Sequence, residues 1–478
     1  MHKICLSLLG IWILTACSTT QPSSRNDLPI EVPSAWSTQP EMEGELPEGW
    51  IKDFNSPQLT ELIHTGLKNN YDLQATAARL SILNAEVTIA GADQLPQFSA
   101  NFAGQRERRN FIGFPDGFGG EEEVINNTTN SFNAFLDLSW ELDLWGRLQD
   151  QKLAAVGDFQ AAQVDLWGAR LSLAAQIAQA WFAAIESELQ LKLIDETAKS
   201  FRHNADLIQK RFNRGLSSAL DLRLARANAL AAESGSANRK RTLDERVRTL
   251  EVLLGNYPED QLDLASSFPV LQTNVPVGLP SKLLTRRPDL IAAERRLAAA
   301  DLRVSEARKA LLPRISLTSG AGTASEELDD LLDSDFFVWN LTGNLLQPIF
   351  EGGRLRAKIQ RARAVREETL ADYAATVLNA FREVETALAA EAFLKEEEEG
   401  LRLTAEESVE AEKIAWERYQ KGLSDIITTL EAQRRAFTTQ RDYIATRLLR
   451  LNNRVNLYLA LGGEFKIEDQ DLAFNFLD

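Results

Sequence analysis

Side chains suited to metal or acid–base chemistry are scarce in this sequence of 478 residues. It contains 3 His and 2 Cys, which are few ligands for a zinc or iron site. Serine and carboxylate residues are abundant, but almost no histidine is present to act as their general base. Gly352-Gly353 begins a predicted helix without the Gly-x-x-x-x-Gly-Lys pattern of a phosphate-binding loop. The sequence therefore predicts no enzyme, no cofactor and no resident metal.

Cys17 is the residue whose surroundings predict covalent chemistry. Lys3 precedes a mostly apolar run from Ile4 to Leu14, and Leu14-Thr15-Ala16-Cys17 follows. This pattern is typical of a secretory signal ending in small residues, and it resembles the lipobox of bacterial lipoproteins. That resemblance implies cleavage before Cys17 and lipidation of its thiol and new N-terminus, and Ser18 in place of Asp favours the outer membrane. The alternative is an ordinary secretory signal with an incidental cysteine.

The overall charge argues against a nucleic acid as a partner. The chain has 52 Lys+Arg against 69 Asp+Glu, a formal net charge of −17. Such a charge disfavours binding to phosphate backbones or anionic lipid surfaces by bulk electrostatics. With 44% hydrophobic and 25% charged residues, the composition is that of a folded chain rather than a disordered one.

The sequence repeats itself over about two hundred residues, a far longer period than that of a solenoid. The early motifs Asp72-Leu73 and Leu95-Pro96 recur 217 residues later, as Asp289-Leu290 and Leu312-Pro313. Later motifs recur after 207 residues: Gly146-Arg147-Leu148 as Gly353-Arg354-Leu355, Arg211 as Arg418, Gly215-Leu216-Ser217 as Gly422-Leu423-Ser424, and Leu254-Gly255 as Leu461-Gly462. The difference predicts a variable loop at 110–130 with a shorter counterpart around 325–335, so each half is one structural unit.

Each half contains stretches in which apolar and polar residues alternate. In the segment 131–144 the even positions from Phe132 to Leu142 are apolar and most odd positions are polar. A period of two indicates a strand with two unlike faces. The predicted strands are about 97–109, 131–144, 314–323 and 337–347.

The remaining sequence is mostly helical in composition and nearly free of proline. The predicted long helices are 146–213, 217–255, 352–420 and 424–461. Gly215 and Gly422 lie at the turns between them, where positive φ is often needed, and Ser217 or Ser218 can cap the next helix. Helices of this length must pack as an extended bundle or coiled coil.

Four strands with one apolar face each need something to cover that face. A membrane barrel needs closure and at least about eight strands, and one chain supplies four. Either the strands face a soluble core, or several chains pool their strands in one barrel. The pattern alone leaves both possibilities open.

The segment between the halves carries a family resemblance. Its sequence, Val275-Pro276-Val277-Gly278-Leu279-Pro280-Ser281-Lys282-Leu283-Leu284-Thr285-Arg286-Arg287-Pro288-Asp289-Leu290, resembles the linker of TolC-like outer-membrane efflux factors. With the lipobox, the order of strands and helices and the paired glycine turns, it is similar to the lipoprotein branch, called NodT-like or OprM-like, from Trp50 to Gly463.

The resemblance implies a fold that is mainly α with β. Long coiled-coil hairpins of three chains would form an α-barrel, and four strands per chain would form a trimeric 12-stranded outer-membrane β-barrel. The expected organisation is a signal peptide (1–16), a lipidated N-terminal segment (17–50), a first repeat (51–270), a linker with the second repeat (271–462) and a C-terminal segment (463–478).

The resemblance also implies a function and partners. The chain would be the passive outer-membrane channel of a tripartite efflux system, a homotrimer with its helices in the periplasm of a Gram-negative bacterium. Its partners would be a periplasmic adaptor protein, an inner-membrane pump of the resistance-nodulation-division type and outer-membrane lipid. The alternatives are a type I secretion channel and a structural coiled-coil lipoprotein of the periplasm.

Two groups of residues match functional positions of that family. The resemblance assigns adaptor docking to the helix-turn tip, with Arg211, Gly215, Arg418, Tyr419 and Gly422. It assigns a periplasmic gate to the carboxylates of Asp221 and Glu431, the basic Arg434, the apolar Ile427, and Asp425, which is either a ring member or a cap. Thr428 stands where several relatives carry Asp, which implies a less acidic ring. Turn glycines that only shape the backbone and charges that only face solvent are the alternatives.

Overall fold

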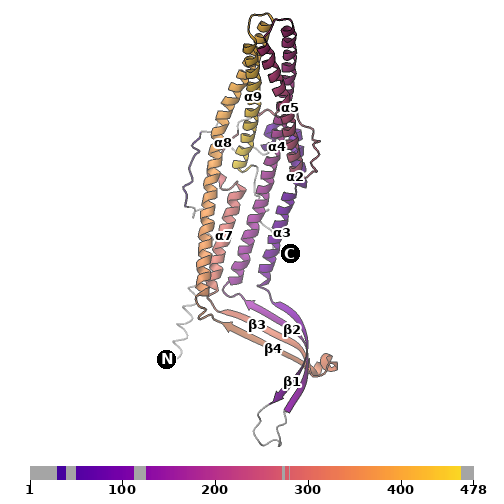
Figure 1. Cartoon of the computed structure of the whole chain (residues 1–478). Helices are drawn as coiled ribbons and strands as arrows, with labels where there is room; N and C mark the ends of the chain where they lie inside the picture. The colour runs from indigo at the N-terminus through magenta and orange to yellow at the C-terminus, as the bar shows by residue number, and fades with distance from the viewer. Residues whose placement is uncertain (1–28, 39–49, 112–124, 272–274, 279, 464–478) are drawn as a thin grey trace. The chain divides into compact units, whose positions relative to one another are not determined.

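The computed structural model describes residues 29–38, 50–111, 125–271, 275–278 and 280–463 (Figure 1). Cys17 and the predicted signal segment therefore lie outside the described residues. The chain divides into two compact units. The described part of one combines Ser81–Phe159 with Arg295–Ala371, and the other unit combines Leu28–Leu80, Gln160–Glu294 and Asp372–Asp478.

The first unit contains one antiparallel sheet with the strand order β1-β2-β3-β4. The strands are β1 (Gln97–Phe111), β2 (Ile125–Leu142), β3 (Arg314–Ser325) and β4 (Phe337–Leu346) (Figure 1). Two strands come from each half of the sequence, and the halves join where β2 pairs with β3. β1 and β4 are the edges, so each has one side that no described strand pairs with.

The first hairpin is longer than the alternation predicts. Residues 125–130, placed in the variable loop by the sequence, form the start of β2 and pair with Arg106–Phe111 of β1. Most residues there are polar, with Asn126, Asn127 and Thr128 in succession. Backbone hydrogen bonds continue the pairing of the two strands beyond the end of the apolar face. Alternation of apolar and polar residues therefore cannot predict this part of the hairpin.

Two tryptophans attach the sheet to the chain that leads into it. The Trp140 indole N–H donates to the Gln94 carbonyl at 3.0 Å, just before β1. The Trp145 indole N–H donates to the Pro313 carbonyl at 2.7 Å, just before β3. Each contact satisfies a polar atom of a large ring and fixes where a strand begins.

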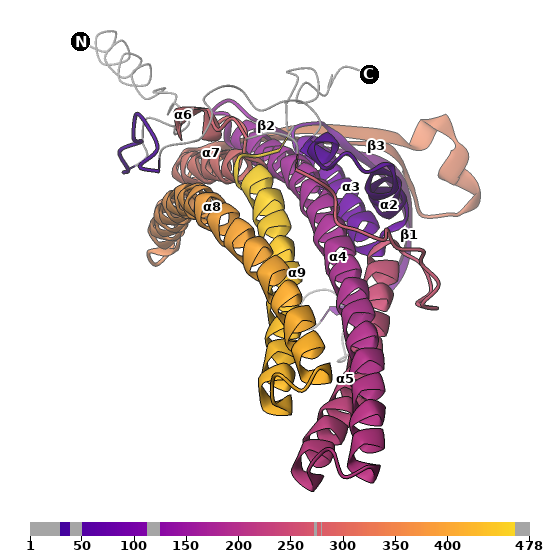
Figure 2. The same cartoon turned by 90° about the horizontal axis from the view of Figure 1, so that it is seen from above.

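The long helices have equal lengths in the two halves. α4 (Arg147–Asn213) and α8 (Arg354–Gln420) each have 67 residues, and α5 (Ala219–Leu253) and α9 (Ile426–Ala460) each have 35. α5 lies beside α4, and α9 beside α8 (Figures 1 and 2). The predicted fold class is confirmed: long helical hairpins, a four-stranded sheet and an internal repeat.

Shorter helices complete the described chain: η2 (Trp50–Phe54), α2 (Pro57–Asn69), α3 (Tyr71–Ala92), α6 (Pro280–Leu283), α7 (Pro288–Lys309), η3 (Asp329–Leu332) and η4 (Ser334–Phe336). Within the described ranges, no helix is both long and apolar enough to cross a lipid bilayer.

Both return helices end on a glycine in the left-handed region. Gly255 follows α5 with φ +78°, and Gly462 follows α9 with φ +87°. A Cβ on Gly255 would lie 2.6 Å from the Asn69 carbonyl oxygen, and one on Gly462 would lie 2.9 Å from the Arg286 carbonyl oxygen. The same close backbone approach thus ends both return helices, at positions that the repeat relates.

A side chain beside each glycine holds the end of the return helix. The Asn70 amide donates to the Leu253 carbonyl at 3.0 Å. At the related position, Arg287 donates to the Ala460 carbonyl at 3.2 Å and forms ion pairs with Asp289 and Glu383, each at 2.7 Å. Burial opposes the charge of Arg287, but the two carboxylates outweigh it and raise its pKa.

The core of the second unit surrounds one buried arginine. Arg454 forms ion pairs with Glu391 at 2.7 Å and with Asp53 at 3.3 Å, and its side chain is 2% exposed. Close to it, the Trp50 and Tyr458 rings lie 5.9 Å apart. Breaking a buried ion pair costs several kcal/mol because one charge is left uncompensated, so this cluster holds η2 firmly against α9.

We expect Gly255→Ala to destabilise the protein more than Gly215→Ala. Both glycines have φ near +75° (+78° and +74°), and an alanine there costs about 1–2 kcal/mol. Only at Gly255 does the new Cβ meet backbone, since nothing lies within 4 Å of it at Gly215. Overpacking adds about 1–3 kcal/mol. Thermal unfolding in detergent, followed by circular dichroism, measures the difference, and equal losses in the two variants would contradict the close approach.

Candidate functional site

The turn between α4 and α5 is built by a glycine and a capping box. Gly215 has φ +74° and allows the Leu216 N–H to bond back to the Arg211 carbonyl at 2.9 Å. Ser218 then caps α5: its hydroxyl accepts from the Asp221 N–H at 3.1 Å, and the Asp221 carboxylate accepts from the Ser218 N–H at 2.9 Å. Asp221, a predicted gate carboxylate, is therefore part of the cap in a single chain.

The turn between α8 and α9 repeats this construction. Gly422 also has φ +74°, and the Leu423 N–H bonds to the Arg418 carbonyl at 2.8 Å. Asp425 caps α9 by accepting from the Thr428 N–H at 2.7 Å. That bond lowers the pKa of the Asp425 carboxyl, so it stays ionised well into acid. In a single chain Asp425 is thus the N-cap of α9.

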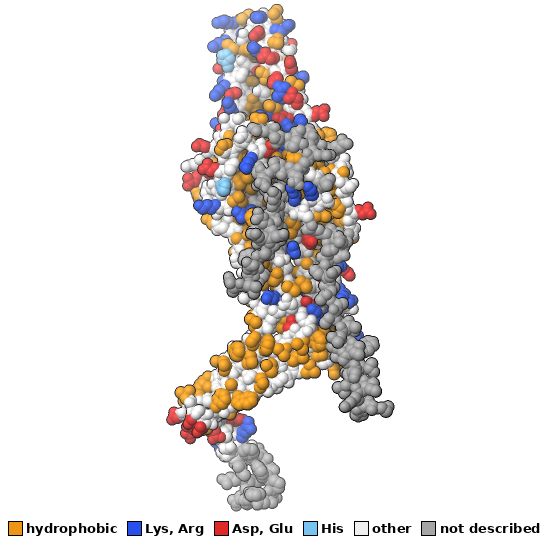
Figure 3. All heavy atoms as spheres, turned by 180° about the vertical axis from the view of Figure 1, so that it is seen from behind, with side chains coloured by type: hydrophobic (Ala, Val, Ile, Leu, Met, Phe, Trp, Pro, Cys, Tyr) orange, Lys and Arg blue, Asp and Glu red, His pale blue; other side chains and the backbone are white. Residues whose placement is uncertain are grey.

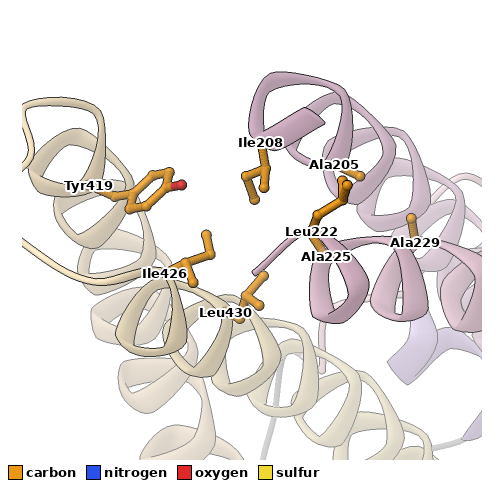
Figure 4. Close-up of a cluster of buried hydrophobic side chains, with 8 residues drawn as sticks. All are labelled: Ala205, Ile208, Leu222, Ala225, Ala229, Tyr419, Ile426 and Leu430. Carbon is orange, nitrogen blue, oxygen red and sulfur yellow. The ribbon is translucent and has the colours of Figure 1, made fainter. Parts of the chain in front are cut away.

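Tyr419 connects the two turns within one chain and belongs to a cluster of buried apolar side chains from both hairpins (Figure 4). Its ring is 6% exposed and lies under the Arg211 guanidinium, with 5.0 Å from that carbon to the ring centroid. Its hydroxyl lies 3.2 Å from the Ser217 hydroxyl. The structure thus brings together Arg211 and Tyr419, both assigned to the tip by resemblance. Ser217 was considered only as a cap, because no local pattern relates it to a tyrosine 202 residues away.

Among the described residues, no contact joins Asp221 to the predicted gate residues on α9. Arg434 binds Glu431 one turn earlier on the same helix, with Nη2 to Oε1 at 2.7 Å. The hydrogen bond from Arg434 lowers the pKa of Glu431, and the carboxylate in turn raises the pKa of Arg434. Ile427 is 59% exposed. These side chains therefore present a neutralised ion pair and an apolar group to the surroundings of the tip.

The sheet has one apolar face and one polar face. Residues opposite one another in an antiparallel pair point to the same side, and the register places apolar side chains of all four strands on one side. They are Phe98, Ala100 and Phe102 of β1; Phe132, Ala134, Leu136, Leu138, Trp140 and Leu142 of β2; Ile315, Leu317 and Ala321 of β3; and Phe337, Trp339, Leu341 and Leu345 of β4. We call this set the apolar band.

The apolar band is only partly covered in the single chain: its side chains are exposed on β1 and β4 and mostly half-buried on β2 and β3. Trp339 and Leu345 are each 70% exposed, and Phe98 is 65% exposed. Hydrophobic side chains gather over the strands in the space-filling view (Figure 3). The opposite side of the sheet carries polar residues, among them Asn133, Asp137, Glu141, Asn340 and Asn344. An exposed apolar surface of this extent marks an interaction with lipid or protein.

Comparison with known proteins gives matches along nearly the whole chain. The family model described as outer membrane efflux protein matches residues 62–256 and 279–463. The toluene efflux pump outer membrane protein TtgF of Pseudomonas putida is 31% identical over 460 residues, covering 94% of each chain. The outer membrane protein OprJ of Pseudomonas aeruginosa is 33% identical over 465 residues, covering 96% of this chain and 95% of that one.

Solved structures agree in fold. The CmeC outer membrane channel of Campylobacter jejuni has a TM-score of 0.83 at 27% identity and covers 91% of each chain. The MtrE outer membrane channel of Neisseria gonorrhoeae, in its open state, has a TM-score of 0.80 at 27% identity, with 94% of this chain and 99% of that one covered. The chain described here belongs to the outer membrane efflux protein family.

Proposed function

We propose that this chain is the outer-membrane channel of a tripartite efflux system, a passive trimeric conduit for substrates delivered by an inner-membrane pump. The observation that carries the proposal is the apolar band on an open four-stranded sheet. Membership in a family whose relatives are named efflux pump outer membrane proteins supports it.

The dimensions of the apolar band suit a lipid bilayer. On β2 the band runs from Phe132 to Leu142, about 33 Å at 3.3 Å per residue. At the usual strand tilt this is about 25 Å in height, which is the height of the lipid-facing zone of outer-membrane barrels. Beyond it, the same side of β1 carries Arg106 and Arg108. The band therefore ends in charged residues, where a polar headgroup region would begin.

The edges of the sheet support assembly from several copies. The strands alternate in direction, so β1 and β4 run antiparallel to each other, and β4 of one copy can extend the ladder onto β1 of the next. Open edges cannot lie in lipid, because their backbone groups would be unsatisfied. Three copies would close a ring of twelve strands, with the apolar band outward and Asp137, Glu141 and Asn340 lining a water-filled lumen.

The helix turns are the proposed docking site for a periplasmic adaptor. Arg211, Gly215, Arg418, Tyr419 and Gly422 lie at or beside the two turns, and several basic side chains surround them.

The remaining parts of the proposed system follow from the same family. We assign the pump to the resistance-nodulation-division type and place the helices in the periplasm of a Gram-negative bacterium. We also assign a lipid anchor to Cys17. The energy for transport would come from the pump, since the conduit needs no catalytic chemistry.

The gate is assigned to Asp221, Asp425, Ile427, Glu431 and Arg434. In a threefold assembly each would occur three times around one axis, and converging carboxylates attract cations. Because Arg434 already neutralises Glu431 within α9, the net charge at the mouth depends on that ion pair.

Leu341→Lys should block membrane insertion, whereas Thr342→Lys should not. Leu341 lies on the apolar band and is 60% exposed, and its neighbour Thr342 lies on the polar face. A lysine facing lipid near the midplane costs about 2–4 kcal/mol. The measurement is the amount of detergent-extractable trimer in outer-membrane fractions, by light scattering. A water-soluble wild-type monomer, or normal insertion of Leu341→Lys, would overturn the barrel assignment.

Lipidation should be accessory to insertion. The Cys17→Ser variant, expressed with a cleavable signal, should remain largely in the outer membrane. The reason is that a membrane-spanning barrel attaches a protein to the bilayer more strongly than one lipid anchor does. Fractionation with immunoblotting measures this. Complete release to the periplasm would show that the anchor, rather than the sheet, holds the protein.

Single-channel recording in planar bilayers tests the gate. Wild type should conduct poorly and be blocked by multivalent cations from the periplasmic side. Glu431→Ala should lose the block, and Arg434→Ala should conduct more and be blocked at lower cation concentration, since it exposes the carboxylate. Glu399→Ala, which removes an ion pair of the same spacing from α8, is the matched control. Unchanged conductance and unchanged cation block in both α9 variants would show that these charges lie on a solvated helix face and do not line the channel.

A further inference from the structure

Two arginines lie just beyond the end of the apolar band, on the same side of the sheet. On β2 the band ends at Phe132. The next cross-strand pair on that side sets Arg106 opposite Asn130, and the pair after it sets Arg108 opposite Thr128. We call these four residues the arginine rim. It places two cations and two hydrogen-bonding side chains next to an apolar surface.

The positive charge of the arginine rim is not neutralised within the described part of the chain. Arg106 and Arg108 are both exposed, and neither forms an ion pair there. Arg109 differs, because it lies on the polar side of β1 and binds Glu107, with Nε to Oε1 at 2.9 Å. One strand of a chain with a net charge of −17 therefore carries a neutral pair on one side and two uncompensated positive charges on the other.

The arginine rim lies at the end of the sheet that is remote from the helices. β1 follows α3, and β2 leads into α4. The register pairs the start of β1 with the end of β2, so residues 106–108 and 128–130 lie toward the opposite end. With the helices in the periplasm, as proposed above, that end faces the outer leaflet. An arginine there can lay its aliphatic stem along the band and keep its guanidinium at headgroup level.

We propose that the arginine rim binds the phosphate group of a phosphorylated lipid in the outer leaflet, while the acyl chains of that lipid lie along the apolar band. The inference rests on the membrane barrel of the proposed function. Arg106 and Arg108 are two residues apart on one side of a strand, about 6.6 Å, so both guanidiniums can reach one phosphate. Guanidinium forms bidentate, charge-assisted hydrogen bonds with phosphate, and Asn130 and Thr128 add further polar groups.

A lipid suits the arginine rim better than a second copy of the chain does. The β3–β4 connection carries the exposed carboxylates of Asp329, Asp333 and Asp335, and in a ring of copies β4 would lie beside β1 of the next chain. Such carboxylates would use only the charge of the arginines, in exposed ion pairs that contribute little. A phosphorylated lipid uses both the charge and the adjoining apolar surface.

Native mass spectrometry of the full-length trimer in detergent tests the inference, with lipid A as the phosphorylated lipid. Wild type should retain lipid A. Arg106→Ala and Arg108→Ala should each weaken binding about fivefold, and together about thirtyfold, since each arginine near a charged headgroup contributes about one factor of five. Arg109→Ala is the matched control, because it removes the same charge from the opposite side of β1, and it should bind lipid A as wild type does.

The form of the phosphate provides a further control. Lipid A without its phosphates should bind wild type as weakly as intact lipid A binds the double variant, and inorganic phosphate should not displace the lipid. Equal weakening by Arg109→Ala, or equal binding of the phosphate-free lipid, would overturn the inference.

Thermal unfolding in detergent provides a second measurement. A ligand that binds only the folded protein raises the unfolding temperature, so lipid A should raise it for wild type and for Arg109→Ala, and much less for the double variant. A double variant that falls apart into monomers with unchanged lipid binding would assign the arginines to the acidic connection of the next copy. A stable trimer that binds lipid A equally with and without the arginines would overturn the inference and leave the proposed function intact. A water-soluble wild-type monomer would overturn both.

Discussion

The structure depends on one constraint, which is that the described part of one chain forms a four-stranded sheet with an apolar side and two edges that no described strand pairs with. The register aligns the apolar residues of all four strands on the same side, and on the edge strands β1 and β4 those side chains are exposed. Each half of the sequence supplies one hairpin, so the repeat doubles the width of the sheet without covering it. The indoles of Trp140 and Trp145, bonded to carbonyls just ahead of β1 and β3, fix where this surface begins.

A second constraint acts at the turns between the long helices. A long helix can reverse within five residues only if a glycine takes positive φ and a side chain caps the next helix. Gly215 with Ser218, and Gly422 with Asp425, meet both needs. The residues around the turns are thereby held on rigid helix ends, and this rigidity is what allows Arg211 to stack on Tyr419.

Much of this architecture could be predicted from the sequence. Period-two alternation identified the four strands, the scarcity of proline identified the long helices, and repeated motifs identified the two halves. The start of β2 could not be predicted, because Asn126 and Thr128 give no alternating pattern. Contacts such as that of Ser217 with Tyr419, or the ion pair that ties Arg434 to Glu431, depend on tertiary approach and rotamer choice. The family resemblance named the tip residues but gave no information on which of them meet.

The arginine at the end of the second return helix shows how far the two halves have diverged. Asn70 and Arg287 occupy related positions and bond to related carbonyls, of Leu253 and Ala460. Only Arg287 also binds two carboxylates, and Gln176 stands in the first half where Glu383 stands in the second. The halves are therefore no longer interchangeable parts. A chain assembled from two first halves would retain the shape of the junction and lose its charge pairing. In the proposed trimer, three such chains would form six equal sectors, whereas the natural sequence would form two kinds of sector in alternation.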